Sequence, residues 1–133
     1  MPFVLDSRLE RDTYPILSIG LCALRLMDDR RWPWLILVPA RSAIREIHEL
    51  TPLDQAMLSF ETALVAETFA RITDCDKINS GALGNVVEQL HVHVVARKRG
   101  DENWPGPVWG HGTRVPYRAG EAEALIADIR AAF

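Results

Sequence analysis

Three side chains with polar nitrogen atoms, those of Gln89, His91 and His93, alternate with apolar residues in the stretch EQLHVHVVARK. Such alternation is typical of a β-strand, in which residues two apart project from the same face about 6.6 Å apart. We therefore expect a strand from Glu88 to Lys98, with the polar side chains in one row and the apolar row packed against helices. The polar row would place two imidazole rings and an amide side by side on a rigid support.

Two interpretations of this row involve no covalent chemistry. In the first, the histidines are structural and only hydrogen-bonded, which is the ordinary expectation for a single histidine and a weaker one for a pair beside a glutamine. In the second, the imidazoles bind zinc, which would need a third ligand from elsewhere in the chain. His48 precedes a predicted helix and His111 lies in a loop, and the sequence contains no HExxH or paired-cysteine motif. The metal interpretation therefore has little support, and we predict no metal site.

In the third interpretation the row is catalytic. An imidazole nitrogen can attack phosphorus and carry the phosphoryl group covalently, and a second imidazole can pass a proton to the leaving oxygen. The attacking nitrogen must be unprotonated, and the reference pKa of histidine, about 6.5, allows this at neutral pH. This interpretation explains why both histidines lie on one strand, and we favour it.

The rest of the sequence predicts the elements that must position this strand. Residues 16–38 predict two apolar antiparallel strands around the turn Asp28–Arg31. Thr51, Pro52 and Asp54 mark the start of a helix that reaches Arg71. This helix has an apolar stripe that we expect to face the protein core: Leu53, Met57, Phe60, Leu64, Phe69 and Ile72. We expect its polar residues Gln55, Glu61 and Glu67 to face water.

Two further elements follow the long helix. Lys77–Ala82 predicts a strand before a turn at 81–85, and Glu121–Phe133 predicts a helix with one apolar side. Between them, the prolines and glycines of residues 100–117 exclude regular structure. Strands, one long helix, further strands and a final helix predict a single α+β domain over residues 1–133, with a mostly antiparallel sheet.

Composition narrows the class of protein. The chain has 133 residues, 25% of them charged, and a formal net charge of −3. This charge argues against a protein that coats nucleic acid, and the basic run Arg97 to Arg99 is expected to be solvated surface. The most apolar run has 12 residues and contains Arg25, which is too short to span a membrane. The sequence predicts no signal peptide, and we expect its two cysteines, Cys22 and Cys75, to be buried thiols. We therefore expect a cytoplasmic protein.

At the polar strand the sequence resembles the histidine triad (HIT) superfamily, whose motif is His-φ-His-φ-His-φ-φ with φ apolar. Residues 89–95 fit this motif with glutamine at the first position. NSGALGN resembles the Asn/Gly segment before the triad, and WLILVPAR resembles the family's strand that ends in Val/Ile-Pro-Lys/Arg. The resemblance covers most of Arg25 to Arg99, and ENWPGPVWG resembles a bacterial branch with glutamine at the first triad position.

The resemblance implies a role for each triad residue. His91 would attack the α-phosphorus of a nucleotide and form a nucleotidyl-histidine intermediate, and His93 would contact the phosphate and the departing oxygen. Gln89 stands at the first triad position, where its amide can exchange hydrogen bonds but cannot shuttle a proton at neutral pH. Trp34 and Ser42 stand where many members have further histidines.

The resemblance also implies nucleotide-binding residues and an assembly. Asn79, Gly84 and Asn85 would line the phosphates, and Asp28 lies near the family's ribose-binding position. Trp104 and Trp109, in the Trp/Pro-rich loop 103–112, are expected to pack, to cover a base or to close a dimer. Family members are commonly two-fold dimers, so we expect a homodimer.

These observations together predict a HIT-like hydrolase or nucleotidyl transferase. Its substrate would be a nucleotide phosphoanhydride, phosphoramidate or phosphoester, such as a dinucleoside polyphosphate or a nucleoside phosphoramidate. We expect no cofactor, although Mg²⁺ can accompany a polyphosphate substrate, and we expect no nucleic-acid or membrane partner. The alternatives are a nucleotide-binding module that has lost turnover and, more distantly, a histidine-based metal-binding protein.

Overall fold

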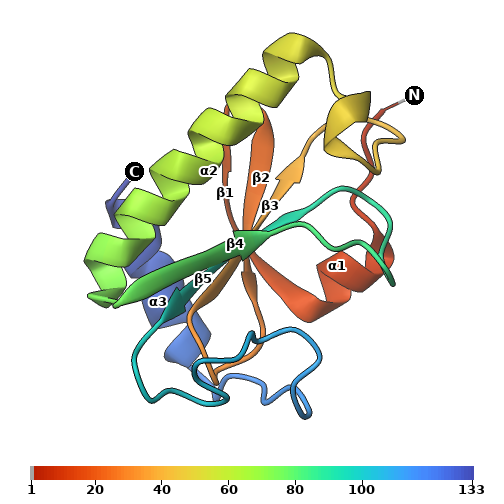
Figure 1. The fold of residues 1–133 in the computed structure, drawn as a ribbon. Coiled ribbons are helices and arrows are strands. Elements are labelled where there is room, and N and C mark those ends of the chain that lie inside the picture. The colour runs from red at the N-terminus through yellow and green to blue at the C-terminus, as the bar shows by residue number, and fades with distance from the viewer. Residues whose placement is uncertain (1) are drawn as a thin grey trace.

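A computed structural model describes residues 2–133 of the chain. Helices and strands alternate along it in the way expected of an α+β domain (Figure 1). In chain order they are α1 (Ser7–Asp12), β1 (Thr13–Ile19), β2 (Cys22–Met27), β3 (Trp34–Pro39), the 3-10 turn η1 (Ile47–Glu49), α2 (Pro52–Thr73), β4 (Lys77–Gly81), β5 (Val92–Arg97) and α3 (Glu121–Ala131). None of the helices within residues 2–133 is long and apolar enough to cross a membrane.

The five strands form one antiparallel sheet in the order β1-β2-β3-β5-β4. β5 therefore lies inside the sheet, where it pairs with β3 on one side and with β4 on the other. The helices α2 and α3 cover one face (Figure 1), and their core includes Val92, Val94 and Leu90. The prediction that the apolar row of this strand packs against helices is confirmed.

A second core covers the opposite face of the sheet. It includes Trp34 and Val95 from the central strands, Leu9 from α1 and Val108 from the segment between β5 and α3. His93 projects toward this face because it alternates with Val92 and Val94. The polar row is thus enclosed rather than half exposed, and His93 lies at the end of the β5–β4 pairing, opposite Gly81.

The strand that carries the histidines is shorter than predicted. Regular pairing begins at Val92, so Gln89 lies before the strand rather than in it. Leu90 donates its N–H to Ile44 O instead of to a neighbouring strand, and the paired part of β4 ends at Gly81. The expected row is therefore divided between a strand and the segment that leads into it.

The start of α2 confirms the capping prediction. Thr51 Oγ1 accepts the N–H of Asp54 at 3.1 Å, Pro52 stands in the first turn, and the helix ends before Asp74 in a left-handed conformation with φ 51°. The predicted core stripe is wrong at three of its six positions, because Leu53 is 72% exposed, Phe60 62% and Leu64 37%. It is confirmed at Phe69, which is buried, and at Met57 and Ile72, which pack against the core. The other buried residues of the helix are Leu58, Glu61, Val65 and Thr68.

The face of α2 that meets the sheet contains a carboxylate, which explains the error. Glu61, predicted to face water, is only 2% exposed, and its two oxygens accept the N–H groups of Leu21 at 2.7 Å and Cys22 at 3.0 Å. Leu21 lies in the turn between β1 and β2, and Cys22 begins β2. Residues 16–27, expected to form the first of the two predicted strands, therefore contain parts of two strands. A Cβ at Gly20 would lie 2.6 Å from Glu61 Oε2, so the turn requires glycine for space.

The remaining elements agree with the prediction in kind and differ in detail. No regular element occurs between β5 and α3, as expected, and α3 buries Ala122, Ile126 and Ile129 while Phe133 is exposed. α1 was not predicted, although Asp6 caps it by accepting the N–H of Arg8 at 2.8 Å. Both cysteines are free thiols, but only one, Cys22, is fully buried.

Candidate active site

His91 and His93 lie together at the start of β5, with ring centroids 4.9 Å apart and an interplanar angle of 69°. His91 is 7% exposed and His93 6%. Two nearly buried imidazoles cannot both be solvated, so each ring nitrogen needs a protein partner or must face a cavity. The partners that they have define the protonation of each ring.

The Nδ1 of His91 lies 2.7 Å from the backbone oxygen of Gln89. A carbonyl oxygen can only accept a hydrogen bond, so Nδ1 carries the proton and donates it. In the neutral ring this leaves the lone pair on Nε2. The backbone just before the strand therefore fixes the tautomer of His91 that presents a nucleophilic Nε2.

The opposite assignment holds for His93. Trp34 Nε1 lies 3.0 Å from His93 Nδ1, and an indole nitrogen can only donate. His93 Nδ1 therefore accepts, and the proton of the neutral ring is on Nε2. Burial, with a smaller contribution from the neighbouring His91, lowers the pKa of His93 to about 3, so the ring is neutral at physiological pH.

Gln89 contributes its backbone to His91 and its side chain to the N-terminal segment. Its Oε1 accepts the N–H of Asp6 at 2.8 Å, and its Nε2 donates to Val4 O at 2.9 Å. The side-chain amide thus accepts one backbone hydrogen bond and donates another, as the C=O and N–H of a neighbouring strand would. Gln89 thus binds residues 4–6 to the segment that precedes the histidines.

The two histidines open into a cavity of about 320 Å³, which we call the histidine pocket. It is bounded by α1, the end of β2, the loop 83–87 and the loop that follows β5, and its lining residues are Arg8, Leu9, Asp12, Met27, Trp34, Leu83, Gly84, Asn85, Val86, Val87, His91, His93, Trp109 and Gly110. Arg8 Nη1 donates to Val86 O at 3.1 Å and links two of these walls. The pocket is mostly apolar, and its polar or charged lining side chains other than those of the histidines and tryptophans are Arg8, Asp12 and Asn85.

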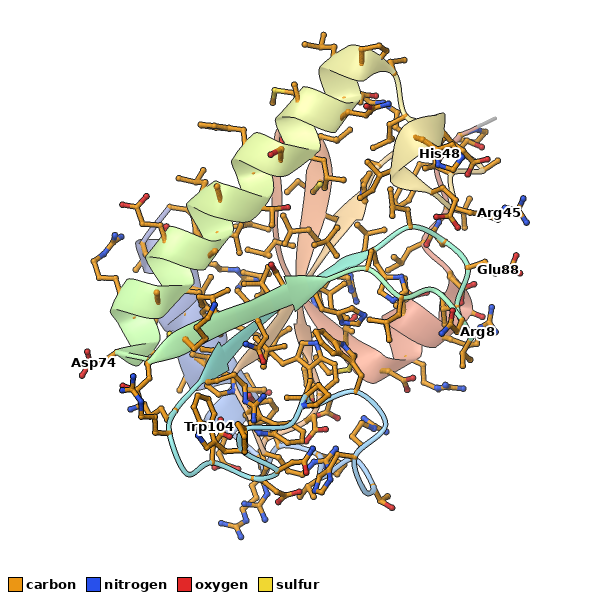
Figure 2. All side chains as sticks on the ribbon, viewed as in Figure 1. Arg8, Arg45, His48, Asp74, Glu88 and Trp104 are labelled. Carbon is orange, nitrogen blue, oxygen red and sulfur yellow. The ribbon has the colours of Figure 1, made fainter. Side chains whose placement is uncertain are left out.

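A second cavity of about 330 Å³, the neighbouring cavity, shares Leu83, Gly84 and His91 with the histidine pocket. Its other lining residues include Arg45 and His48. Figure 2 shows these two side chains on the same side of the molecule as Arg8 and Glu88. His91 is thus the one histidine that faces both cavities, whereas His93 faces the histidine pocket alone.

The predicted phosphate- and ribose-binding residues separate into two groups. Gly84, with φ +74°, and Asn85 line the histidine pocket beside His91. Asn79 does not line it, because its Oδ1 accepts from Arg97 Nη1 at 3.0 Å. Asp28 is engaged with the C-terminal segment, where it accepts the N–H of Tyr117 at 2.9 Å and pairs with Arg114 at 3.3 Å.

The loop after β5 is organised by Arg97, which is 1% exposed and therefore not the solvated residue predicted from the basic run. It continues the inward row of His93 and Val95, and Asp101 pairs with it at 2.7 Å. Arg97 Nη1 also donates to Gly106 O at 2.8 Å, and its guanidinium lies 5.4 Å from the ring centre of Trp104. Figure 2 labels Trp104 within this loop.

The same loop brings Trp109 to the site. Its ring centroid is 5.5 Å from that of His93, and its indole Nε1 is buried without a hydrogen-bond partner among the described residues. The sequence placed Trp109 in a loop with no fixed role, since nothing in a proline-rich segment indicates which strand it will cover. The α1 residues Arg8 and Leu9 were also missed, although the Asp6 cap was a readable sign of α1, and Trp34 was noted only as standing at a family histidine position.

Within residues 2–133, no group of three or more histidine, cysteine, aspartate or glutamate side chains is arranged to hold a metal ion. His91 and His93 therefore have no third ligand of these types beside them in the described part of the chain. Both Nδ1 atoms already have hydrogen-bond partners, so His91 Nε2 is the one nitrogen of the two rings that keeps a free lone pair.

An antiparallel sheet with one long helix on one face, and two histidines at the start of the interior strand β5, defines the class of fold. Comparison with known proteins then gives the family: the model of the HIT domain matches residues 8–100. The chain belongs to the HIT domain family.

Solved structures of bacterial histidine triad proteins agree closely with this assignment. One from Sinorhizobium meliloti 1021 is 60% identical, with a TM-score of 0.96, and the match covers 98% of this chain and 97% of that chain. One from Marinobacter aquaeolei VT8 is 42% identical, with a TM-score of 0.97 and coverage of 99% and 96%. One from Bradyrhizobium japonicum is 41% identical, with a TM-score of 0.95 and coverage of 98% of both chains. No curated protein sequence matches this chain.

Proposed function

We propose that the chain is a nucleotide hydrolase or nucleotidyl transferase in which His91 attacks the α-phosphorus of the substrate. The observation that carries this proposal is the hydrogen bond from His91 Nδ1 to Gln89 O at 2.7 Å, which leaves the lone pair on the ring nitrogen that remains for the pocket. A nucleophile needs such an orienting partner, and here the partner is rigid backbone.

The proposed reaction has two steps. In the first, the lone pair of His91 Nε2 forms a bond to phosphorus, the bond from phosphorus to the leaving group breaks, and its electron pair leaves with that group. His91 becomes a positively charged nucleotidyl-imidazole, whose Nδ1–H continues to donate to Gln89 O. In the second, water attacks phosphorus, the P–N pair returns to Nε2, and the water proton is released to solvent; another acceptor in place of water would give a nucleotidyl transferase.

The lining of the histidine pocket supports a nucleotide as the ligand. Leu9, Met27 and Trp109 offer apolar surface to a base and ribose, whereas Gly84 and Asn85 offer backbone and amide groups beside His91. Asn79 and Asp28 are proposed as further contacts on the family resemblance alone. Each would first have to exchange its present partner, Arg97 or Arg114, for the ligand.

The test is cleavage of a diadenosine polyphosphate and of a fluorogenic adenosine phosphoramidate, with the nucleoside monophosphate as the product. His91→Ala should lower kcat at least about a thousandfold, as removal of a nucleophile does. Mass spectrometry of the natural chain denatured at alkaline pH, where the P–N bond survives, should find one nucleotidyl group on His91. Turnover that survives in His91→Ala would contradict the assignment of the nucleophile.

The alternative of a binding module without turnover keeps some support, because Gln89 cannot shuttle a proton. Nucleotide binding without cleavage over a broad substrate panel, in the natural chain and in Gln89→His, would establish it. The metal alternative predicts zinc that co-purifies in equimolar amount. The proposed mechanism uses no metal bound by the protein itself.

We also propose that the chain forms a homodimer through the outer face of α2. Leu53, Phe60 and Leu64 are exposed there at spacings of seven and four residues, so they form one apolar stripe along the helix. The adjacent strand β4 is an edge of the sheet, which offers unpaired backbone groups next to this stripe. A second copy of the chain would cover both features at once.

A further inference from the structure

The hydrogen bond from Trp34 to His93 determines what His93 can do in the proposed reaction. Trp34 Nε1 occupies His93 Nδ1 at 3.0 Å, the two ring centroids are 5.6 Å apart, and both residues are buried. A second proton on His93 would have to enter at Nδ1, where the indole N–H already points. A neutral imidazole with its proton on Nε2 can donate a hydrogen bond, but it is an extremely weak acid, so it delivers no proton to a leaving group.

The other groups of the histidine pocket do not supply the missing acid. Gln89 stands at the first triad position without an ionisable side chain, and its amide is bound to Val4 and Asp6. The pKa of Asp12 is lowered by hydrogen bonding to Arg11, so this carboxyl group is ionised at neutral pH. Arg8 is a cation whose pKa is raised by Asp6, and His91 uses its free nitrogen for the attack.

We propose that Trp34 is a positioning residue that fixes His93 as a neutral Nε2–H donor, and that it thereby restricts the enzyme to leaving groups that depart as stable anions. This inference rests on the proposed function, and it narrows its substrate class. His93 Nε2–H would donate a hydrogen bond to the departing atom, which keeps the electron pair of the broken bond and takes no proton from the protein.

Phosphoanhydrides satisfy this requirement and phosphoramidates do not. A phosphate group leaves as a stable anion because its second pKa is about 6. An amine must be protonated as it leaves, since amines of the lysine type have a pKa of about 10.4. General acid catalysis raises a rate about 10²- to 10⁴-fold where it operates. Without it, kcat/KM for a phosphoramidate should be at least about a hundredfold lower than kcat/KM for a phosphoanhydride.

Spectroscopy tests the positioning claim without any turnover. In ¹⁵N-labelled protein, two-bond ¹H–¹⁵N correlation spectra should give His93 an unprotonated Nδ1 and a protonated Nε2, unchanged between pH 8 and pH 5. Trp34→Phe keeps an aromatic ring and removes the donor, so the His93 signals should shift toward a mixture of tautomers. Trp32→Phe is the matched control, because Trp32 lies edge-on to Trp34 at 6.2 Å but donates to Glu102 O. Unchanged His93 signals in Trp34→Phe would overturn the claim.

Kinetics tests the consequence for substrates. The ratio of kcat/KM for diadenosine tetraphosphate to that for an adenosine phosphoramidate should be at least about a hundred in the natural chain and in Trp32→Phe. Trp34→His replaces the indole, which can only donate to His93 Nδ1, by an imidazole that can also accept from it. His93 can then carry a second proton, so this variant should lower the ratio of the two kcat/KM values about tenfold or more. Equal cleavage of both substrates by the natural chain would overturn the restriction.

Two further outcomes have distinct meanings. His48 lines the neighbouring cavity, which His91 also lines. If His48→Gln selectively abolishes phosphoramidate cleavage, the acid comes from that cavity and the restriction by Trp34 is wrong. If no substrate is cleaved at all, the proposed function fails, whereas the NMR comparison of Trp34→Phe with Trp32→Phe still decides whether Trp34 fixes the tautomer.

Discussion

The two histidines of the triad have opposite tautomers because different parts of the fold hold their Nδ1 atoms. A backbone carbonyl accepts from His91 at 2.7 Å, and an indole donates to His93 at 3.0 Å. Two residues of the same type, two positions apart, therefore offer a lone pair and an N–H to the same pocket. Sequence spacing predicts that the rings are neighbours, but only the partners decide which ring is basic at Nε2.

Gln89 is the departure from the triad, and the structure gives its side chain a definite contact. We expect Gln89→Ala to loosen residues 4–6 and α1, because two hydrogen bonds of about 1 kcal/mol each are lost. Since α1 forms a wall of the pocket, KM should rise about fivefold or more while kcat changes little. Steady-state kinetics and amide hydrogen exchange of residues 4–9 measure the two effects.

Glu88→Ala is the control for this prediction. Glu88 is the neighbouring residue, but it is exposed, and the one ion pair that it makes within residues 2–133, with Arg45, is long at 3.6 Å. Its loss should leave both readouts unchanged. A large fall in kcat with normal exchange in Gln89→Ala would show instead that the amide takes part in the chemistry.

At the scale of the elements, the contact between α2 and the turn from β1 to β2 depends on one buried carboxylate. We expect Glu61→Ala to lower the free energy of unfolding by about 2 to 4 kcal/mol, because it leaves two buried N–H groups without acceptors at about 1 to 2 kcal/mol each. Glu61→Gln keeps one acceptor and should cost less. Urea denaturation followed by circular dichroism measures both.

The matched control lies on the same helix. Glu67 is exposed, and Glu67→Ala should change the free energy of unfolding by less than about 0.5 kcal/mol. Similar values for the two alanine variants would mean that the carboxylate of Glu61 contributes little to this contact.

Glu61 also shows where prediction from the sequence ends. The existence of α2, its threonine cap and the apolar row of β5 could be predicted, because each is set by neighbouring residues. The buried face of α2 could not, because the stripe Leu53–Phe60–Leu64 is as periodic as the face that is buried and only the sheet distinguishes them. Likewise, the proposed catalytic row was visible at His91 and His93, whereas Trp34 and Trp109 come to the site from another strand and from a loop, which local sequence patterns do not indicate.

At the scale of the whole molecule, the exposed stripe of α2 predicts the assembly. Phe60→Glu should convert the proposed homodimer into a monomer, because it places a charge at the centre of an apolar interface. Sedimentation equilibrium of the natural chain and the variant measures the mass directly. Asp128→Lys, which reverses an exposed charge on α3 and leaves the stripe of α2 unchanged, should remain dimeric.

A natural chain that sediments as a 15.0 kDa monomer at micromolar concentration would contradict the homodimer proposal. A dimer that persists in Phe60→Glu would place the interface elsewhere. Neither outcome affects the assignment of His91, because the hydrogen bonds that fix the tautomers of His91 and His93 are made within one chain.

The aromatic surroundings of His93 have an optical consequence. Three of the four tryptophans gather there: Trp34 and Trp109 lie 5.6 and 5.5 Å from its ring, and Trp32 lies 6.2 Å from Trp34. Three of the four indole rings that can report on this site by fluorescence therefore lie at or next to the proposed reaction centre. Occupancy of the pocket can be followed by intrinsic fluorescence in real time, with no attached dye.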